Sequence, residues 1–213
     1  MIDVATKAGL RVLTINRPEK ANSLTREMLE TLTAAVVDAN ADESLRALVL
    51  TGQGKVFSAG ADLEAAKAGL AVDDIWERLS GAVAASPLLT IAALNGTVAG
   101  GATGMIVACD LRVSVPGAKF FYPVMKLGFL PQPSDPVRLA ALVGPGRAKL
   151  ILMAGQKIEA AEALAMGLVD RVADDPLAEA RVLASDALAA ERAHVAGIKA
   201  LVPRNCRGYS GAS

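Results

Sequence analysis

The fold of this chain is decided by Phe57-Ser58-Ala59-Gly60-Ala61-Asp62-Leu63 and by Asn95-Gly96-Thr97-Val98-Ala99-Gly100-Gly101-Ala102-Thr103-Gly104. In each stretch, small residues stand where the chain passes from a strand pattern to a helix pattern. Backbone N–H groups at the start of a helix have no acceptor within that helix. Small side chains leave such N–H groups open to a ligand.

Two of these N–H groups, those of Ala61 and Gly101, are candidates to bind one ligand oxygen. Gly60 permits a tight turn before Ala61, and Gly100 allows a close approach to the backbone. The predicted helix start at Gly101 adds positive partial charge. Two preorganised donors on a carbonyl oxygen stabilise an enolate, so we predict an oxyanion hole. Close packing of helices would also explain the small residues of either stretch alone. The presence of both stretches in this order favours the oxyanion hole.

The composition narrows the class of protein. The chain has 213 residues, enough for one α/β domain with a substantial core, and 53% of them are hydrophobic. Lys+Arg and Asp+Glu each count 22, and aromatic residues make up 3%, so we expect no nucleic-acid or membrane partner. The two cysteines, Cys109 and Cys206, lack metal-ligand spacing, which predicts no metal and a reduced, cytoplasmic protein. The N-terminus Met1-Ile2-Asp3-Val4 has no basic region leading into an apolar run, so we expect no secretory signal.

Hydrophobic periodicity predicts a layered α/β fold with right-handed crossovers. A long C-terminal helix is predicted to start at Asp175 as N-cap, with Pro176 at its first position, and to run to about Arg192. The tail 203–213 is expected to fray. The predicted strands are 10–16, 46–50, 89–94 and 111–115. The other predicted helices are 25–41, 73–85, 101–108, 137–142, 146–153 and 160–166.

Several further motifs agree in order and spacing with a known family. The chain resembles the crotonase superfamily (enoyl-CoA hydratase/isomerase) over nearly its whole length, as a short and divergent member. The resemblance implies one domain over 1–213 with a crotonase (ClpP-like) α/β fold of repeated ββα units. Its core would be about 1–172 and its helical C-terminal part about 173–202, usually in a homotrimer or hexamer. The motifs that carry it are Ile15–Leu24, Phe57–Leu63, Asn95–Gly101, Cys109-Asp110, Leu127–Pro131, Gly144–Ala148, Ala160–Ala163 and Gly167–Asp170.

The same resemblance implies an acyl-CoA thioester as ligand, with its carbonyl held by the Ala61 and Gly101 N–H groups. It implies no cofactor other than the coenzyme A of the substrate, and a place in fatty acid metabolism as a lyase or isomerase. Arg17 lies where a basic side chain could meet the CoA phosphates, although a solvated loop charge explains it equally well. The remaining residues implied to bind the substrate are Ala21, Ala59, Asp62, Leu63, Gly100 and Val124.

The two positions at which hydratases of this family carry glutamates hold Gly104 and Val124 here. Adding water across a conjugated double bond requires two positioned proton-transfer groups, so we do not expect standard hydratase activity. Asp135, in the loop that replaces a glycine-rich segment, is a candidate displaced base; its alternative is an N-cap for a helix starting at Pro136. The alternative functions are a non-catalytic acyl-CoA binder or sensor, and a scaffold subunit.

Overall fold

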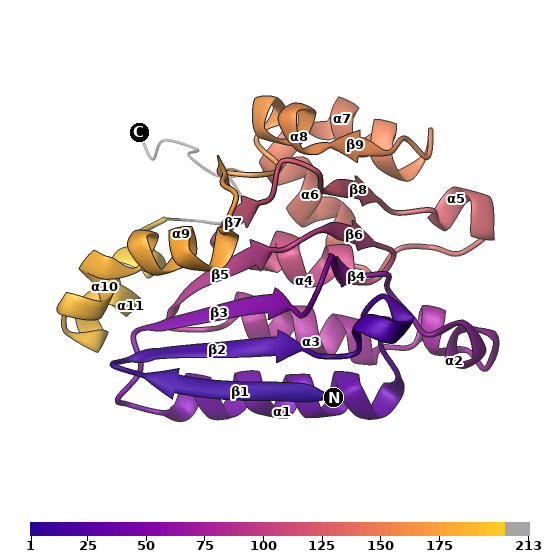
Figure 1. Ribbon diagram of the computed structural model, residues 1–213. Helices are drawn as coiled ribbons and strands as arrows, with labels where there is room; N and C mark the ends of the chain where they lie inside the picture. Colours follow the sequence, from indigo (N-terminus) through magenta and orange to yellow (C-terminus); the bar gives the residue numbers. More distant parts are fainter. Residues whose placement is uncertain (203–213) are drawn as a thin grey trace, which may run out of the picture.

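The computed structural model describes residues 1–202 as two β-sheets surrounded by helices (Figure 1). The predicted fraying of 203–213 lies outside the described residues. The strands are β1 Ile2–Lys7, β2 Leu10–Ile15, β3 Ala47–Gly52, β4 Val56–Ser58, β5 Leu89–Leu94, β6 Thr97–Ala99, β7 Leu111–Ser114, β8 Lys119–Phe121, β9 Ile158–Glu159 and β10 Arg171–Val172. The α-helices are α1 Arg26–Ala41, α2 Leu63–Lys67, α3 Ile75–Ala84, α4 Ala102–Ala108, α5 Val124–Leu127, α6 Asp135–Val143, α7 Pro145–Leu152, α8 Ala160–Met166, α9 Pro176–Leu183, α10 Ser185–Ala189 and α11 Arg192–Leu201.

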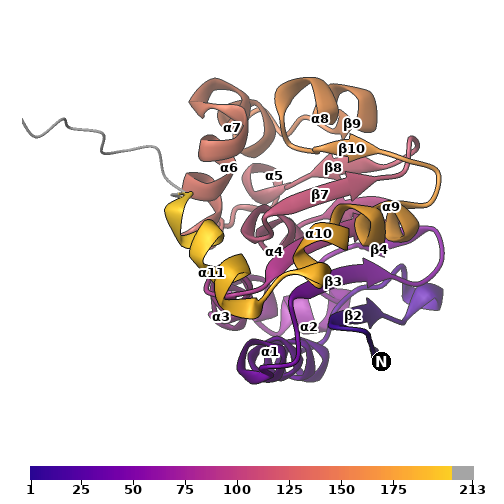
Figure 2. The same cartoon turned by 90° about the vertical axis from the view of Figure 1, so that its left-hand side faces the viewer.

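The larger sheet has the strand order β1-β2-β3-β5-β7-β10 and is parallel except for the β1–β2 hairpin. Its central strands are buried on both faces, which explains their nearly continuous apolar sequences. Leu48 and Leu50 belong to the main core with α1, α3 and α4, whereas Ala47 and Val49 pack with α9. Figure 2, turned by 90°, shows α9 lying across this sheet on the side opposite to α1.

The smaller sheet has the order β4-β6-β8-β9, and its first three strands are parallel neighbours. Val56 pairs with Thr97, and Ala99 pairs with Phe121. Parallel neighbours end at the same edge of a sheet, and ligands of open α/β sheets bind at such edges. The turns that follow β4, β6 and β8 therefore lie side by side.

The sequence predicts the strongly periodic elements well and the C-terminal helix only in part. Asp175 does cap α9, because its carboxylate accepts from the backbone N–H groups of Leu177 and Ala178. The single helix predicted to run to about Arg192 is wrong, since α9 ends at Leu183 and is followed by α10 and α11. The chain turns there, and α11 brings Lys199 Nζ to within 2.6 Å of Leu88 O beside β5.

Within residues 1–202, no helix combines the length and the hydropathy needed to cross a lipid bilayer.

Candidate functional site

A cavity of about 460 Å³ lies at the carboxyl ends of β4, β6 and β8. Most of the residues predicted for the site line it: Ala21, Ala59, Ala61, Leu63, Gly100, Gly101 and Val124. The rest of the lining is largely apolar and aromatic and includes Trp76, Phe121, Tyr122, Phe129 and Leu130. Three predicted residues, Arg17, Asp62 and Asp135, do not line it. The structure thus gathers the small-residue turns around one largely apolar cavity.

The turn after β4 is fixed by backbone hydrogen bonds on both sides of Ala61. Leu24 N donates to Gly60 O over 2.8 Å, and Asp62 N donates to Leu24 O over 2.8 Å. This is a parallel bridge between Leu24 and Ala61, so the Ala61 N–H lies on the side away from Leu24. In the part of the chain that the structure describes, the Ala61 N–H donates to no acceptor.

Gly60 brings the two small-residue turns into contact. Its φ of +88° lies in the left-handed region that favours glycine. A Cβ at this position would stand 2.8 Å from Ala99 O and 3.4 Å from Gly100 Cα. A side chain on residue 60 would therefore push the β4 and β6 turns apart.

The turn after β6 leads through Gly100 to Gly101, which precedes α4. Gly100 N donates to Phe121 O over 3.2 Å, and this bond ties the turn to the neighbouring strand β8. The Gly101 N–H, like that of Ala61, donates to no acceptor within residues 1–202. A Cβ on Gly101 would meet the Trp76 ring at 2.8 Å, so the indole packs directly on this glycine. Trp76 was not predicted, because its position in α3 reads as an ordinary core residue.

The Asn22 side chain connects the loop before α1 to the β4 turn. Asn22 is fully buried, and its Nδ2 donates to Gln53 O over 2.9 Å and to Val56 O over 2.6 Å. Ser58 Oγ donates to Asn22 O, and Ala59 N donates to Ala21 O. These bonds hold Ala21 and Ala59 together at the cavity.

Arg17 and Asp62 are paired with each other beside the cavity. Arg17 Nη1 lies 2.8 Å from Asp62 Oδ2 and also donates to Ser23 O. The hydrogen bond from Arg17 lowers the pKa of the Asp62 carboxyl below its usual 3.8. Asp62 Oδ1 accepts from Glu64 N and Ala65 N and so caps α2. Their contact with CoA stays a prediction.

Asp135 lies directly against Gly104. A Cβ on Gly104 would stand 2.6 Å from Asp135 Oδ1 and 2.9 Å from Oδ2. Tyr122 Oη donates to Asp135 Oδ2 over 3.0 Å, and within residues 1–202 Oδ1 has no hydrogen-bond partner. Tyr122 lines the cavity, whereas Asp135 lies behind it with only 2% of its surface exposed. The alternative role as an N-cap is wrong: Ser134 holds that position, and Asp135 is the first residue of α6.

The surroundings of Asp135 favour its neutral form. Burial, together with the nearby Glu77 carboxylate, raises the pKa of its carboxyl from 3.8 to about 7. The Tyr122 hydroxyl and the Arg138 guanidinium act in the opposite direction. Burial and the negative charge of Asp135 also raise the pKa of the Tyr122 phenol far above its usual range. Tyr122 is therefore neutral at physiological pH, and Asp135 changes its protonation there.

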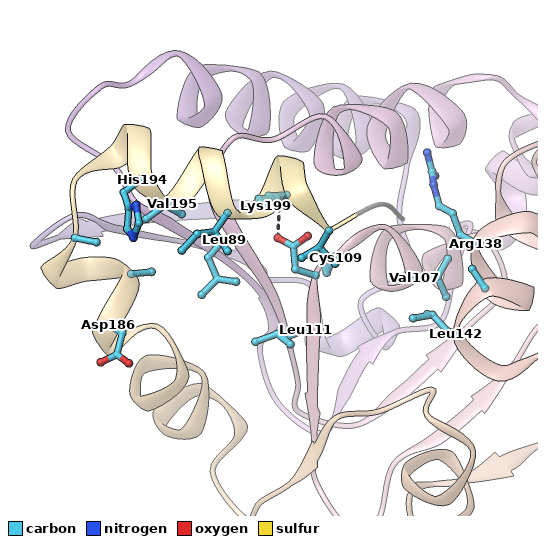
Figure 3. A pocket seen from close by; sticks show the side chains of 16 residues that line it. Leu89, Val107, Cys109, Leu111, Arg138, Leu142, Asp186, His194, Val195 and Lys199 are labelled. Atoms are coloured by element: carbon cyan, nitrogen blue, oxygen red, sulfur yellow. Dashed lines mark ion pairs between the residues drawn. The ribbon is translucent and has the colours of Figure 1, made fainter. Parts of the chain in front are cut away.

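A second, larger cavity of about 790 Å³ lies between α4, α6, α10 and α11 (Figure 3). Its lining is mostly apolar, and Lys199 forms a 2.6 Å ion pair with Asp110 across it. His194 also lies here rather than at the first cavity. None of the residues predicted for the site lines this second cavity, so its size does not make it the reaction site.

The geometry and the comparisons with known proteins agree on one family. Residues 5–210 match the family described as enoyl-CoA hydratase/isomerase. The chain is 37% identical over 186 residues to "Probable enoyl-CoA hydratase echA6" of Mycobacterium tuberculosis, covering 87% of this chain and 75% of that protein. It is 38% identical over 195 residues to "Probable enoyl-CoA hydratase EchA14" of the same species, covering 89% and 76%.

A solved structure of an enoyl-CoA hydratase from Bacillus anthracis is similar to this chain with a TM-score of 0.87 and 31% identity, over 93% of this chain and 81% of that one. This chain belongs to the enoyl-CoA hydratase/isomerase family of the crotonase superfamily, and its fold is the α/β crotonase fold that the motifs predicted.

Proposed function

We propose that this protein binds an acyl-CoA thioester and polarises its carbonyl through the Ala61 and Gly101 N–H groups. One observation carries the proposal: two backbone donors on adjoining turns, without acceptors in the described chain, lie beside one largely apolar cavity. N–H groups at a turn and at a helix start that have no acceptor in the chain are open to an outside partner, so a couple of this kind beside one cavity suits a ligand oxygen. A thioester oxygen that gains negative charge is such a ligand.

The remaining parts of the proposal follow from family membership. The CoA moiety would pass Ala21, Ala59 and Leu63, and the acyl chain would contact Val124 and the aromatic residues of the lining. The protein would act as a cytoplasmic homotrimer or hexamer in fatty acid metabolism, without a cofactor beyond the coenzyme A of its substrate. Apolar lining with a few placed polar groups is typical of small-molecule sites.

A second candidate function, a non-catalytic acyl-CoA binder or sensor, is favoured by Gly104 and Val124. Neither residue can transfer a proton, and both stand at positions where the family resemblance leads one to expect glutamate. A binder would need the two backbone donors and the cavity but no acid or base.

The first test measures binding and hydration together. We expect calorimetry to detect binding of butyryl-CoA and crotonyl-CoA, while crotonyl-CoA is hydrated far below about 1 s⁻¹, the lower end of typical enzyme turnover. The physical reason is that only one proton-transfer group, at most, is available for a reaction that needs two. Hydration at ordinary enzyme rates would contradict the proposal. Absence of binding to every acyl-CoA tried would instead favour a scaffold subunit.

The second test removes a single donor. Replacing Ala61 by lactic acid converts its amide to an ester, which deletes the N–H and keeps the methyl group. We expect acyl-CoA affinity to fall by about 1 kcal/mol, roughly fivefold, as for a typical hydrogen bond. The same exchange at Ala68, whose N–H donates to Glu64 O outside the cavity, is the matched control and should leave affinity unchanged. Equal affinities for all three proteins would remove Ala61 from the site.

A further inference from the structure

Tyr122 is the one titratable side chain among the described residues that line the cavity. It directly follows Phe121, which pairs with Ala99, so Tyr122 stands next to Gly100 on the adjoining strand end. Neighbouring strands are about 4.8 Å apart, which places the tyrosine beside the oxyanion-hole turn. Its hydroxyl donates to Asp135 over 3.0 Å. Tyr122 thus connects the cavity to a carboxylate that lies behind it.

That carboxylate occupies the space that a side chain at position 104 would need. Position 104 lies about one helical turn beyond Gly101, on the helix that the second small-residue turn opens. The Asp135 oxygens approach this point to within 3 Å, from α6, a different element. The family resemblance leads one to expect a glutamate at position 104. With glycine there, the Asp135 carboxylate fills the space beside this position instead.

The Asp135 carboxylate is costly for folding as it stands. It is 2% exposed, lies near Glu77, and one of its oxygens lacks a partner within residues 1–202. Buried carboxylates of this kind lower stability unless they are fully paired, and they concentrate at functional sites. Purely structural packing beside Gly104 would be served better by an apolar side chain of similar size.

We propose that Tyr122 and Asp135 form a two-residue proton relay that removes and returns the α-proton of an acyl-CoA bound in the cavity. The inference rests on the proposed function, because it needs the thioester carbonyl on Ala61 and Gly101. Tyr122 is the catalytic residue, since it lines the cavity in which the acyl chain would lie. Asp135 acts through Tyr122 and is a positioning residue that also holds the proton.

The step balances without a co-reactant. The Tyr122 oxygen takes the α-proton while its own phenolic proton passes to the Asp135 carboxylate. The electron pair of the Cα–H bond becomes the Cα=C bond of the enolate, and the carbonyl π pair moves onto the thioester oxygen, held by the two N–H groups. Exchange of the phenolic proton with water, followed by the reverse transfer, leaves an acyl-CoA with one α-hydrogen taken from solvent.

The charged groups around Asp135 set the pH at which this relay works. Glu77 faces it from α3, Arg138 from the next turn of α6, and Tyr122 from the end of β8, while α4 contributes no titratable side chain. Burial and Glu77 raise the pKa of Asp135 to about 7. The carboxylate form is the one that accepts a proton, so proton removal should rise as pH passes through 7 and level off above it.

The test is deuterium exchange into butyryl-CoA in D₂O, followed by mass spectrometry, with binding measured separately by calorimetry. We expect the protein to exchange the α-hydrogens at least about 100-fold faster than buffer alone. Tyr122→Phe should keep affinity within about twofold and lower exchange by at least about 100-fold. Asp135→Asn should lower exchange similarly and abolish its rise near pH 7, an effect that a purely structural role would not produce.

Ser134→Ala is the matched control, because Ser134 neighbours Asp135 and its buried hydroxyl has no partner within the described chain. Exchange in this variant should equal that of the original protein. Butyryl-CoA binding without exchange, or undiminished exchange in a folded Tyr122→Phe protein, would overturn the relay and leave the proposed function standing. A lack of binding would overturn the proposed function itself.

Discussion

The unfolding free energy of an Asp135→Asn variant, relative to that of the original chain, is expected to increase as the pH rises. The folded state holds the Asp135 pKa at about 7, above the usual 3.8. Well below pH 3.8 the carboxyl is protonated in both the folded and the unfolded chain, so its ionisation contributes nothing to stability there. As pH rises from 4 to 7, the unfolded chain ionises first, so the original protein loses stability.

The size of the effect follows from the displacement of the pKa. A pKa difference of about three units corresponds to about 4 kcal/mol once both states are ionised, and about 3 kcal/mol of this falls between pH 4.5 and 8. Asparagine does not titrate, so its own hydrogen bonds shift the stability of the variant equally at every pH. The difference in unfolding free energy between variant and original should therefore change by about 3 kcal/mol across this range.

Urea unfolding of both proteins at several pH values between 4.5 and 8 measures this difference. Asp174→Asn removes one negative charge from an exposed aspartate and serves as the control. Parallel pH profiles for Asp135→Asn and the original chain would mean that Asp135 ionises normally. The relay would then lose the basis for its pH dependence.

The sequence could predict the elements whose pattern is local. Helix α1 covers nearly the predicted span because five core residues recur on one of its faces, and β5 matches its prediction because the strand is apolar except for Thr90. The short strands β4, β6 and β8 were not predicted. Each of these strands is only three residues long, too short for a recognisable alternation of apolar and polar residues. The strands that pair are about twenty to forty positions apart in the sequence. Yet these strands bring the site together.

The candidate site, too, was predicted only in part from the sequence. The small-residue turns at Ala61 and Gly101 were found because glycine spacing is visible in sequence. The contact between Gly104 and Asp135 was not, since it depends on how α4 and α6 pack. The sequence did contain a usable signal. The expected carboxylate is absent at position 104, while Asp135 stands in a loop where the family pattern leads one to expect glycine. Only the structure shows that the two changes meet in space, with Tyr122 bound to the carboxylate.

The second large effect concerns the contact between Gly104 and Asp135. We expect the stability change caused by Gly104→Ala to have opposite signs in the presence and in the absence of Asp135. Gly104→Ala should destabilise the original protein by about 1–3 kcal/mol, because the new methyl group would stand 2.6 Å from an Asp135 oxygen in a packed interior. In an Asp135→Ala background the same substitution should stabilise by about 0.5–1 kcal/mol, since alanine is favoured over glycine within a helix.

The cycle of four proteins isolates the contact, because the lost hydrogen bond of Tyr122 is common to both proteins that lack Asp135 and cancels. Gly81→Ala in α3 is the matched control: a Cβ there meets nothing within 4 Å, so this change should stabilise the original chain and the Asp135→Ala chain alike. Unfolding free energies from urea titration give all the values. If Gly104→Ala stabilises the original protein as Gly81→Ala does, Asp135 does not occupy the space beside Gly104. An interaction energy of 2 kcal/mol or more would instead show that the glycine is present to admit the carboxylate.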